Sequence, residues 1–329
     1  MRLRLVPEGT TLDFFRFVPI TFGLSAMAAI ASVVLFFTFG LNFGIDFRGG
    51  SMIMTETQEE VPISEYREVL SVLDVGDISV TEISDPAAEL TGAAQFSAMI
   101  RVEQQDGDPA IQQGTIALVI ETLDAAIPDL TILATESVGA KVSGELVQAG
   151  ALAVALAIGV VLFYIWLRFE WQFSVGAVAA LVHDVILTIG VFALVGLEFN
   201  LAIVAAILTI VGYSLNDTVV VFDRVRENLK RYKKKPLVDV LNQSINETLS
   251  RTIMTSVTTL IALISLYILG GEVIRGFTFA MIWGVLVGTY SSIFVASAVL
   301  LRLDVKRDWS KPSGEGGGGA GTQFANIDA

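Results

Sequence analysis

The 329-residue sequence contains no cysteine and only one histidine, His183. The lack of cysteine excludes a disulfide scaffold, a thiolate zinc site and a cysteine nucleophile, and a single imidazole is too few for a histidine-based metal cluster. Charged residues make up only 17% of the chain, compared with about 25% in an average soluble domain. The net charge of −13 argues against nucleic-acid binding, which requires a basic face. We therefore expect no metal, no cofactor and no nucleic-acid partner.

Hydrophobic residues, in contrast, make up 53% of the sequence and gather in six long stretches. A membrane-spanning helix needs about 20 apolar residues, because the hydrocarbon core is ~30 Å thick and a helix rises ~1.5 Å per residue. The first stretch exceeds the about 7–15 apolar residues of a signal peptide and lacks a cleavage site, so we expect a retained anchor. The six predicted spans are 17–39, 148–167, 173–197, 199–222, 252–269 and 276–301.

Basic residues set the expected orientation of these spans, because cytoplasmic loops carry an excess of Lys and Arg. Seven basic residues lie between positions 224 and 235, and others precede the first span and follow the sixth. The connection between the third and fourth spans has none, and that between the fifth and sixth has only Arg275. The sequence therefore predicts a multi-pass membrane protein with both termini in the cytoplasm.

The acidic residues are concentrated in the segment between the first two spans. Residues 41–146 contain 19 acidic and four basic side chains, a net charge of −15, whereas the rest of the chain carries +2. This predicts a near-neutral membrane body with an acidic extracytoplasmic domain. The expected division is a cytoplasmic segment 1–16, a first transmembrane helix 17–40, the domain 41–146, five further transmembrane helices in 147–302 and a glycine-rich, disordered cytoplasmic tail 303–329.

The sequence pattern of this domain predicts the order of its strands and helices. Alternating apolar residues predict strands at 51–57, 77–83, 95–103 and 130–137, whereas apolar residues at helical spacing follow Pro62 and Asp108-Pro109. The order β-α-β-β-α-β is that of a ferredoxin-like α+β domain. Its acidity fits either a solvated surface or a docking surface for a partner, and the sequence leaves both open.

Asp217 is the sharpest candidate for a functional residue. An ionisable group at membrane depth costs about 2.5–3.5 kcal/mol or more, so it marks a functional site by default. Asp217 lies inside the fourth span, and Arg251 begins the fifth, from where its side chain is expected to reach Asp217. The spacing fits a proton-dependent switch and a static ion pair equally well. The expected supporting polar residues are Tyr213, Asn216, Thr255, Thr258 and Thr259.

His183 and Asp184 in the third span form a second candidate. Consecutive helical residues point about 100° apart, so we expect the two side chains to face different partners and favour a structural hydrogen bond to another helix. Asp184 and Asp217 also lie in neighbouring spans, as in an intramembrane aspartyl protease. Asn216, however, stands where such enzymes have a glycine before the aspartate, so we do not expect an enzyme.

Several segments resemble the SecD/SecF family of bacterial protein-export proteins, on its SecF side. Residues 43–50, with Asp46, Gly49 and Gly50, are similar to the family signature after the first span. Residues 211–228 are similar to the motif of the fourth span, and residues 250–260 to that of the fifth. The resemblance extends over residues 10–305 and leaves out the tail.

This resemblance implies a function beyond what spacing indicates. Members belong to the resistance–nodulation–division (RND) superfamily, and such a chain would pair with SecD about a pseudo-twofold axis, each contributing half of a 12-helix bundle in the bacterial inner membrane. The pair would use the proton-motive force to assist Sec-dependent translocation of secretory proteins at SecYEG, with YajC and YidC as further partners. Asp217 would then carry the proton, and Arg251 would be its charge partner.

Two alternatives remain at this stage. One is half of a proton-coupled RND transporter of small molecules, although such proteins usually carry two six-span halves in one chain. The other is a passive assembly factor of the Sec translocon, which would need no proton chemistry and would tolerate loss of the Asp217 carboxylate.

Overall fold

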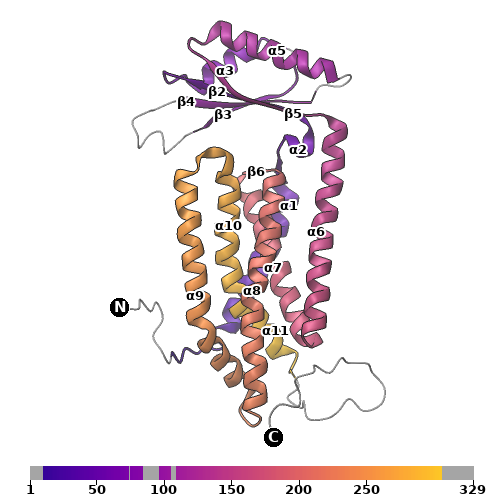
Figure 1. The fold of residues 1–329 in the computed structure, drawn as a ribbon, viewed down its shortest axis with the longest axis vertical. Coiled ribbons are helices and arrows are strands. Elements are labelled where there is room, and N and C mark those ends of the chain that lie inside the picture. Colours follow the sequence, from indigo (N-terminus) through magenta and orange to yellow (C-terminus); the bar gives the residue numbers. More distant parts are fainter. Residues whose placement is uncertain (1–9, 74, 84–95, 105–108, 306–329) are drawn as a thin grey trace.

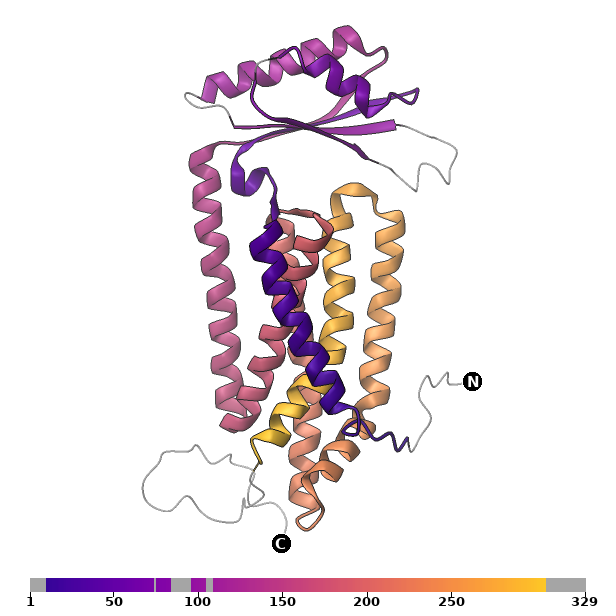
Figure 2. The same cartoon turned by 180° about the vertical axis from the view of Figure 1, so that it is seen from behind.

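A computed structural model describes residues 10–73, 75–83, 96–104 and 109–305. It consists of a bundle of long helices with a small sheet domain at one end (Figures 1 and 2). Within the described residues, six helices are long and apolar enough to cross a membrane, as the sequence predicts. Five of them are α1 (Val18–Phe39), α6 (Ala140–Arg168), α7 (Trp171–Val195), α8 (Leu201–Arg231) and α9 (Leu237–Leu269). The sixth continues through α10 (Gly271–Ser291), a π-helical turn (Ser292–Ala296) and α11 (Ser297–Arg302).

Three helices are longer than their apolar stretches. Helix α8 continues nine residues past position 222, and α9 starts 15 residues before position 252. These extensions form a hairpin whose helices bury Val225 and Leu229 against Val240, Leu241 and Ile245. Apolar pairing within the hairpin keeps the chain helical where the hydropathy pattern has already ended. Helix α6 likewise begins at Ala140, inside the segment expected to belong to the sheet domain.

Glycines bring α10 close to α8, and this contact places the functional residues. A Cβ atom on Gly284 would lie 2.3 Å from a side-chain carbon of Ile210, so the two helices can approach this closely only because the position has no side chain. At Gly288, a Cβ would lie 3.1 Å from Cβ of Ser214. Small residues at such crossings are typical of helix packing in membranes, where close contact replaces the hydrophobic effect.

The sheet domain has the predicted ferredoxin-like topology. Its four strands are β2 (Gly50–Thr57), β3 (Ile78–Ile83), β4 (Phe96–Val102) and β5 (Thr131–Val138), ordered β3-β4-β2-β5 with every neighbouring pair antiparallel. Helices α3 (Ile63–Leu70) and α5 (Pro109–Ala126) cover the face away from the bundle (Figure 1). Ile53 pairs with Ile100 at the centre of this core, and both are fully buried with Val119 and Leu123 of α5.

The other face of the sheet looks toward the bundle. The alternation expected for residues 77–83, which form β3, places Ile78, Val80 and Glu82 on one face of the sheet. In the structure, however, Glu82 is exposed, and Ile83 on the opposite face is buried. Ile83, Met52 and Met99 line a cavity of about 480 Å³ between the sheet and the ends of the membrane helices. Both faces of the sheet are therefore covered, which a two-residue alternation pattern by itself does not indicate.

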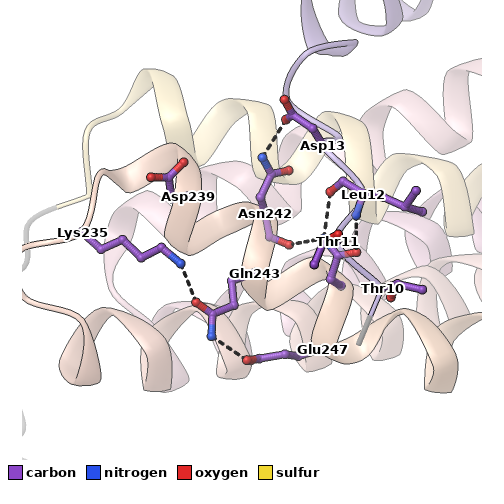
Figure 3. Close-up of a pocket in the computed structure, with 10 residues that line it drawn as sticks. Thr10, Thr11, Leu12, Asp13, Lys235, Asp239, Asn242, Gln243 and Glu247 are labelled. Carbon is purple, nitrogen blue, oxygen red and sulfur yellow. Dashed lines mark hydrogen bonds between the residues drawn. The ribbon is translucent and has the colours of Figure 1, made fainter. Parts of the chain in front are cut away.

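The end of the bundle far from the sheet domain holds the beginning of α1, the end of α11 and the α8–α9 turn (Figure 1). There the segment before α1 lies across α9 (Figure 3). Asn246 accepts a hydrogen bond from the Leu12 amide and donates one to the Leu12 carbonyl, both at 2.9 Å. Asn242 accepts from the Phe14 amide at 2.9 Å and donates to Asp13 at 2.8 Å. A cavity of about 500 Å³ lies beside this contact.

Asn246→Ala is expected to release the segment before α1, because it removes a donor and an acceptor that pair with one backbone residue. Hydrogen bonds of this kind contribute about 1 kcal/mol each, so hydrogen exchange of the Leu12 amide should accelerate several-fold. Gln243→Ala is the matched control, because its amide bonds only other side chains, those of Lys235, Tyr232 and Glu247. Equal exchange at Leu12 in the two variants would contradict this prediction.

Candidate functional site

Asp217 is buried in the bundle and held by two hydroxyl groups. Thr252 of α9 donates a hydrogen bond to Asp217 Oδ1 at 2.5 Å, and Ser292, the first residue of the π-helical turn, donates to Oδ2 at 2.6 Å. The residue is 8% exposed. Three helices thus meet at this carboxylate: α8 supplies it, and α9 and the α10–π segment each supply one donor.

The expected ion pair between Asp217 and Arg251 is not formed within this chain. Among the ion pairs of the described residues, none joins these two side chains, and Arg251 is exposed. Its neighbour Thr252 makes the contact instead. Because consecutive helical residues diverge by about 100°, a helix that directs Thr252 at α8 directs Arg251 toward its own outer surface.

The other predicted polar residues lie around Asp217 without bonding to it. The hydroxyl of Tyr213 is buried and has no hydrogen-bond partner among the described residues. Asn216 is exposed, and Thr259 is half-buried. Thr255 and Thr258 are exposed and donate to carbonyls of their own helix, those of Arg251 and Met254.

The two real partners of Asp217 were missed by the sequence reasoning, and only one had a readable signal. Thr252 belongs to a series of small polar residues at spacing four, Ser244, Thr248, Thr252 and Ser256, all of them buried. Hydroxyl side chains at that spacing on one helix face indicate a polar contact with a neighbouring helix. Ser292 had no comparable signal, because it stands beside Ser291 and spacing alone does not tell which of the two serines faces Asp217.

Asp184 is a second buried carboxylate with its own set of donors. Ser214 of α8 and Ser291 of α10 donate to Asp184 Oδ2 at 2.6 Å and 2.8 Å. The expected hydrogen bond to another helix is thus present at Asp184, whereas the contact of His183 Nδ1 with Asp184 Oδ1 at 2.9 Å was not expected for consecutive residues. The exposed fraction of Asp184 is 2%.

This arrangement suits proton binding better than hydrolysis. A serine or threonine hydroxyl both donates and accepts, so it can bond a carboxylate in either protonation state. Within the part of the chain that the structure describes, Asp184 and Asp217 share no hydrogen-bond donor. An aspartic protease dyad, by contrast, holds two carboxylates against one shared proton. The same residues contain no group of three or more metal-ligating side chains.

The segment after α1 connects the sheet domain to α8. Its short strand β1 (Asn42–Phe43) pairs in parallel with β6 (Glu198–Phe199), just before α8. In the following helix, α2 (Ile45–Arg48), Asp46 accepts a hydrogen bond from the Leu201 amide at 2.9 Å. A carboxylate is stabilising at a helix N-terminus, where free amides give partial positive charge. Asp46 therefore caps the helix that carries Asp217.

Gly49 and Gly50 allow the chain to turn from α2 into the first strand of the sheet. Their φ angles are +76° and +118°, in a region that favours glycine. At Gly50 a Cβ atom would also lie 2.5 Å from the carbonyl oxygen of Val102. Both positions therefore need glycine for a backbone reason, which accounts for the glycine pair beside Asp46.

A further link joins Arg101 of the sheet to Glu198 of β6 through an ion pair. Burial raises the pKa of the Glu198 carboxyl above its ordinary range, and the positive charge of Arg101 opposes this in part. Glu198 lies between α7 and α8, outside the membrane-spanning segments.

Two family models match the chain. Residues 118–306 match the model described as "Protein export membrane protein SecD/SecF, C-terminal", and residues 34–61 match the "SecD/SecF GG Motif". The first range contains both buried carboxylates. The second contains Asp46, Gly49 and Gly50.

Curated relatives match along the whole chain. The protein translocase subunit SecF of Cereibacter sphaeroides is 55% identical over 328 residues, which cover 100% of this chain and 99% of the relative. That of Rhodobacter capsulatus is 53% identical over 316 residues, with 94% of each chain covered. A protein translocase subunit SecDF from Brucella abortus is 42% identical over 306 residues, which cover 93% of this chain but 39% of the relative.

Solved structures give the same picture. SecDF from Thermus thermophilus, described as a translocon-associated membrane protein, matches with a TM-score of 0.79 at 34% sequence identity. The match covers 92% of this chain and 40% of that chain. A structure of SecDF in a super-membrane-facing form matches with a TM-score of 0.62. In each of the three matches called SecDF, this chain corresponds to a minor part of a longer polypeptide.

Glu198→Gln is expected to stabilise the folded protein at alkaline pH and to lose this advantage as the pH falls toward 4.5, the ordinary value for glutamate. A raised pKa means that the folded state binds the proton more tightly than the unfolded state. Glu198 therefore favours folding most at low pH, where it is protonated, and becomes unfavourable to folding as the pH rises through its pKa in the folded state. Thermal unfolding of the detergent-solubilised protein across pH measures the difference. Glu82→Gln, at an exposed position of β3, is the control. An advantage that grows on acidification would contradict this prediction.

Proposed function

Because the chain belongs to the SecD/SecF family of protein-export membrane proteins and is a SecF subunit acting in protein translocation, we propose that it uses the proton-motive force to do so, with Asp217 as the proton-carrying group. It is a multi-pass membrane protein with six spanning helices. Relatives in which SecD and SecF are one chain imply that it pairs with SecD.

The burial of Asp217 among hydroxyl groups carries the proposal. Within the described residues no cation is in direct contact with it, so the ionised carboxylate is stabilised by hydrogen bonds from Thr252 and Ser292 and, without a direct contact, by the positive charge of Arg251. Such a charge at membrane depth costs about 2.5–3.5 kcal/mol or more, whereas one charge crossing 100 mV releases ~2.3 kcal/mol. The two quantities are comparable, so proton entry and release can shift the packing of the three helices around Asp217.

Arg251 fits a role at the boundary with the partner. The outer face of α8 carries small and polar side chains at alternating spacings of three and four: Ala202, Ala205, Thr209, Gly212 and Asn216, all exposed. A Cβ on Gly212 would meet no atom within 4 Å. On α9, Arg251, Thr255 and Thr258 are exposed at the same kind of spacing. We infer that the SecD half covers this face about a pseudo-twofold axis, because an arginine and threonines facing lipid would be costly and small residues permit close helix approach.

The proposed setting is the bacterial inner membrane, with both termini in the cytoplasm and the sheet domain outside. The basic residues at 224–235 support this orientation, and they lie at the end of the bundle opposite the sheet domain (Figure 1). On this view the chain acts on secretory proteins as they leave SecYEG, in an assembly that also includes YajC and YidC. A passive assembly factor would share this setting but would not need Asp217.

Asp217→Asn is expected to abolish the part of protein translocation that depends on the proton-motive force, because an amide keeps the shape but binds no proton in this range. Translocation of a secretory protein into inverted membrane vesicles, with and without a protonophore, measures this part. Asp223→Asn is the control on the same helix, because that side chain is partly exposed and pairs with Arg168. Normal, protonophore-sensitive export by the Asp217 variant would leave the passive assembly factor as the better explanation.

Asn216→Cys is expected to cross-link to co-expressed SecD through a thiol-directed photo-crosslinker, since Asn216 lies on the inferred contact face. The chain itself has no cysteine, so the label is confined to one position. Leu156→Cys is the control, because Leu156 is 59% exposed on α6, which lies on the opposite side of the bundle from α9 (Figures 1 and 2). Cross-linking from Leu156 in preference to Asn216 would place the partner elsewhere.

A further inference from the structure

We propose that Asp184, with His183 beside it, is a second proton-binding group and that it is coupled to Asp217 through Ser291 and Ser292. This rests on the proposed function of Asp217 and adds a site on α7 that the function as stated does not use. The main observation in support is that two consecutive serines, at the start of a π-helical turn, donate hydrogen bonds to two different buried carboxylates.

The two serines lie where α10 gives way to the π-helical turn. Consecutive helical side chains diverge by about 100°, and Ser291 and Ser292, both fully buried, accordingly reach carboxylates on different helices, α7 and α8. π-helical turns are rare and are frequent at functional sites. Here the turn follows the part of α10 that packs on α8, shortly after the contact between Gly288 and Ser214.

Each serine hydroxyl has a second acceptor within reach. Ser291 Oγ lies 2.8 Å from Asp184 Oδ2 and 3.2 Å from the Gly288 carbonyl. Ser292 Oγ lies 2.6 Å from Asp217 Oδ2 and 3.0 Å from the Thr289 carbonyl. A hydroxyl has one hydrogen, so each serine donates either to its carboxylate or to its own helix. Both adjacent residues therefore have two hydrogen-bonding states.

The protonation state of each carboxylate selects between these states. An ionised carboxylate only accepts hydrogen bonds, so Ser291 donates to Asp184; when Asp184 takes one proton, its new O–H becomes a donor. If that proton lies on Oδ2, one of the two hydroxyls there, Ser214 or Ser291, must accept it, and Ser291 can do so by turning its own hydrogen to the Gly288 carbonyl. The same exchange holds for Ser292 and Asp217. Because the two serines are adjacent in one turn, a change in the hydrogen bond of one serine alters the position of the other. The protonation state of one carboxylate therefore affects the hydrogen bond made to the other.

A proton bound at this second site can also reside on His183. Its Nε2 is buried and has no hydrogen-bond partner within the described ranges, while Nδ1 lies against Asp184. A proton taken up here resides on the Asp184 carboxylate or on the imidazole, and the pair gains one positive charge in either case. The other titratable side chains facing this region are Asp217 and Tyr213 on α8 and Tyr290 on α10, whose hydroxyl bonds to Ser25 and to the Thr21 carbonyl of α1; Arg251 on α9 is exposed.

Infrared difference spectroscopy of the purified complex with SecD tests the proposal, because the C=O stretch of a protonated carboxyl is absent when that aspartate becomes asparagine. A pH titration should reveal one band lost in Asp217→Asn and another lost in Asp184→Asn. In Asp184→Asn, the midpoint of the Asp217 band should move by about one pH unit, a tenfold change in proton affinity. Asp184→Glu should restore the second band and the original midpoint. Proton-dependent export should fall in Asp184→Asn and recover in Asp184→Glu.

A structural role for Asp184 would give a different result. Loss of thermal stability with an unchanged Asp217 band and normal proton-dependent export in Asp184→Asn would overturn the inference while leaving the function of Asp217 intact. Failure of Asp217→Asn to affect export would instead overturn the proposed function. Ser291→Ala keeps the test open if Asp184→Asn does not fold: it should also move the Asp217 midpoint. Thr188→Ala is its control, because among the described residues this buried hydroxyl on α7 bonds only the Asp184 backbone carbonyl. Equal midpoints in these two variants would overturn the inference.

Discussion

The buried carboxylate of Asp217 is the constraint on which the rest of the bundle depends. A membrane interior offers no water to solvate it, so protein groups must supply its hydrogen bonds. Two donors, Thr252 and Ser292, come from different helices, and α10 approaches α8 closely because Gly284 has no side chain. The carboxylate thus sets both the polarity and the spacing of three helices.

Much of the fold was predictable because it follows from solvent exclusion. Six apolar stretches of membrane length gave six helices, and alternating apolar residues gave the strands of a ferredoxin-like sheet. The same rules failed where another interaction decides the outcome. The α8–α9 hairpin beyond the apolar stretch depends on pairing between two helices, as between Leu229 and Leu241, and the burial of Ile83 depends on the bundle below the sheet.

The candidate site was predictable in its centre and not in its contacts. Asp217 stands out in the sequence because a charge inside an apolar stretch has a cost. Its partners do not, because the difference between Arg251 and Thr252 is an angle about the α9 axis, and that angle is set by how α9 packs on α8. The bond between His183 and Asp184 was missed for a related reason: an argument from the directions of their Cβ atoms ignores that rotation about the side-chain bonds can bring neighbouring polar atoms together.

Helix α8 runs unbroken from the turn capped by Asp46 to Asp217. Along such a helix each residue adds about 100° of rotation and ~1.5 Å of rise. One inserted or deleted residue between Leu201 and Asp217 would therefore keep the cap only by rotating the carboxylate away from Thr252 and Ser292. Length variation should accordingly be excluded from this part of α8.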